Sequence, residues 1–98
     1  MILVLEYKEK LNGNKKDMMS SCDGFQYTKE AESRLNGTAV RVFETESGAE
    51  LLRYLENITI NNINGPNIDE SALKHLEGQR WIVGVIKRRI FLGKQEKS

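Results

Sequence analysis

The sequence has few of the residues on which disulfide scaffolds and metal sites depend. Its 98 residues include 1 Cys, 1 His and 1 Pro. A single cysteine, Cys22, excludes an intrachain disulfide and favours a reducing compartment. Zinc sites need three or four closely spaced soft ligands, so we predict no metal and no cofactor.

Long apolar runs are also missing. The apolar start, residues 1–5, meets Glu6 at once, which is too short for a signal peptide or a membrane span. We therefore expect a cytoplasmic protein. The hydrophobic content of 39% and the charged content of 30% are typical of a soluble domain, and the length suits one domain over 1–98. Residues 94–98 are predicted to form a short flexible tail.

The sequence also offers few combinations of residues that could form a catalytic site. Cys22 with His75 is the one possible thiol–imidazole pair, and Asp23 beside the thiol disfavours a thiolate. Residues 62–70 alternate oxygen-bearing side chains but lack the leading Asp of a calcium loop, so we expect them to cap a helix. We predict a protein that is not an enzyme.

The hydrophobic pattern predicts an α+β fold in which a mixed, largely antiparallel sheet of four to five strands is covered by two or three short helices. Strands are expected at 2–11, 38–45, 58–60 and 80–92, the last as one long strand or as a hairpin turning at 87–89. Asn12-Gly13 predicts a turn, and 14–24 fits either a returning strand or a short helix.

Helices are expected at three places. The first is 28–35, ended by Asn36-Gly37. The second begins at Ser47, with Glu50 completing a capping box. The third begins near Asn67 or Asp69 and ends at Gly78.

What the chain has in abundance is charge, and the charge is segregated. Residues 44–77 contain seven acids and two bases, a net charge of −5, whereas residues 78–98 contain six bases and one acid, a net charge of +5. The total of +1 therefore hides two surfaces that could attract different partners.

The basic segment predicts one candidate partner-binding surface. Cations and aromatic rings alternate there, a pattern that suits phosphate contacts and base stacking. An edge strand kept soluble by cations is the competing interpretation. The residues of this basic surface are Trp81, Lys87, Arg88, Arg89, Phe91 and Lys94.

Residues 72–77 running into 80–92 resemble the recognition helix and wing of a winged-helix DNA-binding domain. Only about a dozen residues separate Leu55 from Asp69, which leaves no room for the middle helix of that family. The would-be recognition helix also carries acids that repel a phosphate backbone. We do not assign the family.

The acidic segment predicts a second surface, Glu44, Glu46, Glu50 and Glu56, which could imitate a row of phosphates. The leading hypothesis is a non-enzymatic protein that binds another protein. It could be a phage or mobile-element inhibitor of a host nuclease or defence complex, in the manner of an anti-CRISPR protein, or a small regulatory adaptor. The alternative is a nucleic-acid-binding module that uses the basic C-terminal segment. In either case a homodimer is expected, and no membrane partner.

Overall fold

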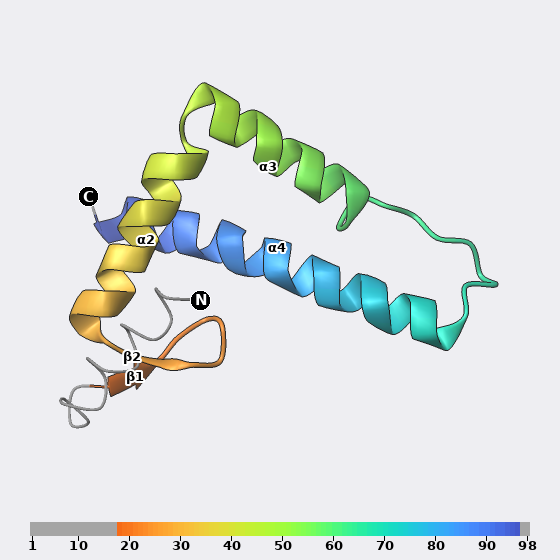
Figure 1. Ribbon diagram of the computed structural model, residues 1–98, viewed down its shortest axis with the longest axis horizontal. Coiled ribbons are helices and arrows are strands. Elements are labelled where there is room, and N and C mark those ends of the chain that lie inside the picture. The colour runs from red at the N-terminus through yellow and green to blue at the C-terminus, as the bar shows by residue number, and fades with distance from the viewer. Residues whose placement is uncertain (1–17, 97–98) are drawn as a thin grey trace, which may run out of the picture.

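A computed structural model describes residues 18–96, and these residues are mostly helical. Figure 1 shows a small hairpin beside three helices. Its strands, β1 (Met18–Ser20) and β2 (Gln26–Thr28), pair antiparallel with Met19 opposite Tyr27. The helices are α2 (Lys29–Phe43), α3 (Glu46–Ile58) and α4 (Glu70–Glu96). Within residues 18–96, every helix is too short or too polar to span a lipid bilayer.

The predicted sheet of four to five strands is wrong. Residues 38–45 lie mostly in α2, residues 58–60 form the end of α3 and a turn, and residues 80–92 lie within α4. Between residues 18 and 96 the sheet has two strands, β1 and β2. The described part of the segment 14–24 contains β1, which pairs with β2 further along the chain. The strand and turn expected within 2–13 lie outside the described residues.

Helix starts were predicted better than helix ends. Thr28, Thr45 and Asp69 each accept a hydrogen bond from the backbone N–H three residues on, the arrangement of an N-cap. The starts at Thr28 and Asp69 agree with the prediction, but the predicted capping box of Ser47 and Glu50 is wrong, because α3 begins at Glu46 and Thr45 caps it. However, α2 continues through Asn36-Gly37, and α4 continues through Gly78. Both predicted stops fail because tertiary contacts outweigh a glycine's cost of about 1 kcal/mol. Residues 94–96, expected to begin a flexible tail, form the last turn of α4.

The core is small and lies mainly between α2 and the C-terminal part of α4. Among the described residues the buried apolar side chains are Ala31, Val40, Leu76, Val83 and Ile90. Leu76, Val83 and Ile90 are seven residues apart, which is two helical turns, so they form one stripe along α4. That spacing is the sequence signal for the long helix. It was hidden because nearly every residue between 81 and 92 is apolar or basic and fits an alternating pattern equally well.

Figure 1 shows how the hairpin and the helices lie relative to one another. The helix α2 crosses α4 near the C-terminal end of α4, and the hairpin lies beside the start of α2. The helix α3 runs back alongside α4 in the opposite direction, and the loop 59–69 joins the two at their far end. The helix α2 therefore contacts all the other elements: the hairpin, α3 and α4.

Candidate functional site

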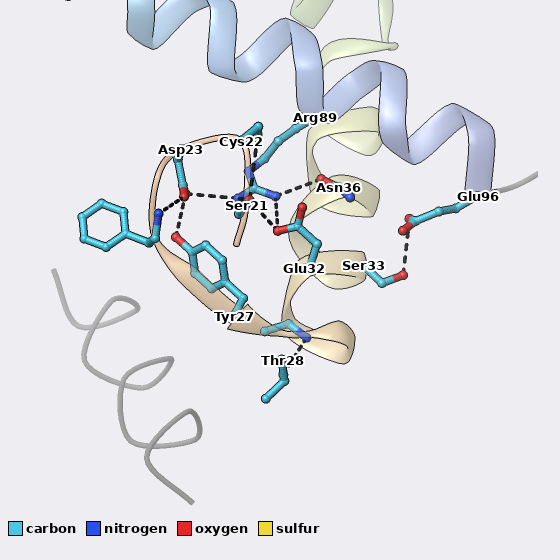
Figure 2. A network of polar contacts seen from close by, with 12 residues as sticks. Ser21, Cys22, Asp23, Tyr27, Thr28, Glu32, Ser33, Asn36, Arg89 and Glu96 are labelled. Atoms are coloured by element: carbon cyan, nitrogen blue, oxygen red, sulfur yellow. Dashed lines mark hydrogen bonds and ion pairs between the residues drawn. The ribbon is translucent and has the colours of Figure 1, made fainter. Parts of the chain in front are cut away.

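The basic surface expected from the sequence is divided in the structure. Arg89 is 7% exposed and lies inside the molecule. Figure 2 shows its guanidinium reaching the hairpin loop on one side and α2 on the other. A residue placed in this way cannot contact a partner without unfolding its surroundings.

Arg89 donates hydrogen bonds to four side chains from two elements. Nη1 donates to Glu32 Oε1 at 3.1 Å and to Asn36 Oδ1 at 2.9 Å. Nη2 donates to Ser21 Oγ at 2.9 Å and to Asp23 Oδ2 at 3.1 Å. This Arg89 cluster joins the hairpin loop, α2 and α4 through one side chain, which matches the planar fork of five donors that arginine offers.

The acceptors in the cluster are themselves held in place. Ser21 Oγ donates to Glu32 Oε1 at 2.7 Å, and Tyr27 Oη donates to Asp23 Oδ2 at 2.6 Å. In the described part of the chain no buried side-chain nitrogen or oxygen lacks a partner. The charged groups of the cluster are the carboxylates of Asp23 and Glu32 and the guanidinium of Arg89, so its net charge is −1. Both carboxylates form ion pairs with Arg89.

These contacts change the titration of the cluster. Burial by itself would raise the pKa of Asp23, but hydrogen bonds from Tyr27, the Phe25 amide and Arg89 outweigh it, and the pKa is lowered. Burial raises the pKa of Tyr27 to about 12, assisted by its hydrogen bond to Asp23. Burial disfavours the charge on Arg89, yet Glu32 and Asp23 raise its pKa overall. Favourable pairing therefore dominates over desolvation for both ions.

We expect the Tyr27 shift to make the fold sensitive to alkali. A phenol whose pKa is raised to about 12 in the folded state stabilises the protein fully below its ordinary pKa of 10.0, and loses that contribution as the pH rises through 12. An absorbance titration of tyrosinate should show a late-titrating group that belongs to Tyr27. That group should be missing from Tyr27→Phe and should remain in Tyr54→Phe. A late phase that survives in Tyr27→Phe contradicts the assignment.

Arg80, which was not predicted as a site residue, holds the end of α3. Its Nε donates to the Thr59 carbonyl at 3.0 Å, and Nη2 donates to the Asn62 carbonyl at 2.8 Å. Its Nη1 also pairs with Glu77 at 2.6 Å. A cation at a helix C-terminus satisfies carbonyls that have no partner within the helix. No sequence signal marks this role, because Thr59 and Asn62 are distant in the chain.

Two more cations of the expected basic surface pair with residues of the expected acidic surface. Lys87 Nζ lies 3.8 Å from Glu56 Oε1, and Lys94 forms an ion pair with Glu44. The −5 and +5 segments therefore meet partly within one molecule. Glu46 and Glu50 remain exposed, without an ion pair in the part of the chain that the structure describes.

The remaining members of the basic surface are accessible. Trp81 is 51% exposed, and the Arg88 guanidinium lies over the exposed Phe91 ring at 5.1 Å from its centroid. Trp81 and Arg88 line a hollow of about 230 Å³ together with Cys22, Gly84 and Val85. Arg88 and Cys22 also border a larger open groove of about 620 Å³ that extends over Leu92 to the end of α4. The basic surface thus reduces to an aromatic and apolar strip with one cation.

Another exposed apolar surface lies on α3, and none of its apolar residues was predicted as a site residue. Leu51, Tyr54 and Ile58 are 53%, 57% and 47% exposed. No residue of α3 is buried. These three residues are spaced by three and four positions and so lie on one side of the helix, which we call the α3 face.

The residues considered for catalysis and metal binding do not assemble into a site. Exposed His75 contacts Gln79, its neighbour one turn on, whereas half-buried Cys22 lies in the hairpin loop beside the α4 hollow. Asp69 caps α4, as expected for the loop 62–70. Among the described residues no group of three or more His, Cys, Asp or Glu side chains could hold a metal ion.

Comparisons with protein-family models, with curated proteins and with solved structures found no match.

Proposed function

We propose that this chain is a non-enzymatic protein that binds another protein, and that the α3 face carries the contact. The observation behind the proposal is that an amphipathic helix leaves Leu51, Tyr54 and Ile58 about half exposed. Short helices gain most of their stability from burying such a face, so a helix that buries none of its residues is expected to be covered by a partner.

The exposed charges suggest the chemistry of that partner. Glu46 and Glu50 lie on the same helix, exposed and without an ion pair in the described part of the chain. A partner with an apolar groove and basic residues along its rim would complement the face. Tyr54 suits such a groove, because buried tyrosines often dominate interface energetics.

An inhibitor of a host nuclease or defence complex, or a regulatory adaptor, would both work through such a contact. A basic rim is typical of proteins that hold nucleic acid, which makes the inhibitor the natural first hypothesis. The two are separated by the partner's activity: an inhibitor suppresses it in proportion to complex formed, whereas an adaptor leaves it in place.

Nucleic-acid binding by the chain itself has less support. Of the cations expected to grip phosphates, Arg89 is buried, and Lys87 and Lys94 pair with carboxylates of the same molecule. Arg88 alone is exposed without a carboxylate partner among residues 18–96. One phosphate contact supplies little of the salt-dependent affinity that such proteins need.

The proposal is tested with the immobilised full chain and an extract of its native cells, followed by mass spectrometry of the retained proteins. We expect the wild type to retain a partner that Leu51→Ser with Tyr54→Ser loses. The matched control, Arg53→Ser with Asn57→Ser, changes two exposed residues of the same helix outside the face and should retain it.

Nuclease treatment of the extract gives the decisive outcome. Retention that survives the treatment supports a protein partner. Release of everything bound would indicate nucleic acid instead. Equal retention by the face variant and its control would exclude the α3 face.

A further inference from the structure

A second open surface lies on α4, on the side opposite to its core stripe. Leu76, Val83 and Ile90 face inward, and Trp81, Val85, Arg88 and Leu92 follow one another at spacings of four, three and four residues on another side. That is the spacing of a seam along which two helices pack. A helix with apolar residues on two sides needs a cover for both.

The middle of this seam is a hollow with a glycine floor. A Cβ at Gly84 would meet no side chain of a non-adjacent residue and no backbone beyond its own stretch of α4 within 4 Å. Trp81, Val85, Arg88 and Cys22 border this open hollow of about 230 Å³. The seam therefore presents a large exposed ring and, one turn away, a recess able to receive one.

We propose that a second copy of this chain fills the hollow, so that two α4 helices pack antiparallel across a two-fold axis. With the axis between Ile82 and Val83, Trp81 of each copy lies over Gly84 of the other. A two-fold contact must be self-complementary, because one patch meets itself. A ring and a recess on the same seam meet that condition.

The charged residues fit the same register. Glu77 of each copy lies opposite Arg88 of the other, so the dimer contains two such pairs. Arg88 has no carboxylate partner in the described part of the chain. The Glu77 side chain is 60% exposed and uses Oε1 for Arg80. Its second carboxylate oxygen can therefore accept a hydrogen bond from Arg88 of the second copy. Two such ion pairs at the rim would set the register and disfavour the parallel alternative.

The symmetry also helps the interface reach a workable size. Specific interfaces begin at roughly 1,200 Å² of total buried surface. The contact of one short helix segment buries less surface than that. The two-fold axis makes each contact twice. It also brings the groove beside Leu92 and the Cys22 loop of both copies toward the edge of the dimer interface. This contact is separate from the α3 face, so the two proposals stand or fall independently.

The test is sedimentation velocity of the full chain from low to high micromolar concentration. We expect the wild type to pass from one chain to two. Gly84→Leu fills the hollow where the monomer has space, so it should leave the helical circular dichroism intact and weaken dimerisation at least tenfold. Gln79→Leu, which adds the same side chain at an exposed α4 position outside the seam, should dimerise like the wild type.

A charge exchange tests the register without changing the hollow. Glu77→Lys and Arg88→Glu should each weaken the dimer, and the double variant should regain most of the lost affinity. A wild type that stays monomeric throughout would overturn the proposal. A dimer that tolerates Gly84→Leu, or a double variant no better than the singles, would place the contact elsewhere and overturn it equally.

Discussion

Replacing Arg89 with methionine is expected to lower the free energy of unfolding by about 3–5 kcal/mol, the usual cost of removing one partner from a buried ion pair. The variant leaves the carboxylates of Glu32 and Asp23 without their cation, and Glu32 is 8% exposed. Urea unfolding followed by circular dichroism measures the change. A loss of this size is comparable to the whole stability of many small domains, so part of the population would be unfolded.

The neighbouring residue supplies the control. Arg88→Met removes the same charge from the same helix, one position earlier, at an exposed site. We expect a change within about 0.5 kcal/mol, measured at a concentration low enough to keep the chain monomeric. Adding Glu32→Leu to Arg89→Met should recover part of the loss, because one unpaired buried carboxylate is removed. Equal effects of the two arginine variants would contradict the structural role of Arg89.

Replacing Gly93 with alanine is expected to force α2 and α4 apart. A Cβ at residue 93 would lie 2.5 Å from the Asn36 carbonyl oxygen and 2.6 Å from Val40 Cγ2. Overpacking of this kind costs about 1–3 kcal/mol, more than alanine's advantage in helix propensity returns. Thermal unfolding measures the loss. It should be accompanied by weaker protection of the Val40 and Ile90 amides in hydrogen exchange.

Gly78→Ala is the matched control for that variant. It lies on the same helix, and a Cβ there would meet nothing within 4 Å. Alanine should therefore stabilise α4 by up to about 1 kcal/mol. If Gly93→Ala were as well tolerated as Gly78→Ala, the close approach of α2 and α4 would be wrong.

The misassigned segment 80–92 shows how local patterns can mislead. Its alternating apolar and basic residues fit a strand, a hairpin or a helix, and only the partner of each side chain decides among them. Arg89 was expected on a surface because a cation in an apolar run looks like a binding residue. In the fold it meets Asp23, 66 positions away, and Glu32, 57 positions away. A contact between residues so distant in the chain produces no periodic pattern in the sequence.

The charge segregation was visible at once, but its meaning was not. As a sequence feature, the −5 and +5 segments suggested two surfaces for two partners. In the structure α3 and α4 run side by side in opposite directions, which brings Glu56 to Lys87, and Lys94 reaches Glu44 beyond the end of α2. Two ion pairs between the segments thereby help to hold the helices together. Among the charged residues predicted for the two surfaces, those that stay exposed without an ion pair in the described part of the chain are Glu46 and Glu50 on α3, and Arg88 on α4.

By itself the sequence determined what depends on neighbouring residues: the start of α2 at Thr28 and the start of α4 at Asp69. It missed Thr45 as the cap of α3, because Ser47 followed by Glu50 offered an equally good local pattern. An N-cap hydrogen bond joins residues only three positions apart, so a short stretch of sequence indicates where a helix begins. The tertiary structure alone decided that α4 continues past Gly78, that Arg89 is buried while Arg88 is exposed, and that α3 keeps its apolar face open. Those outcomes depend on which distant side chains a residue meets, and on how much of each helix the small core can cover.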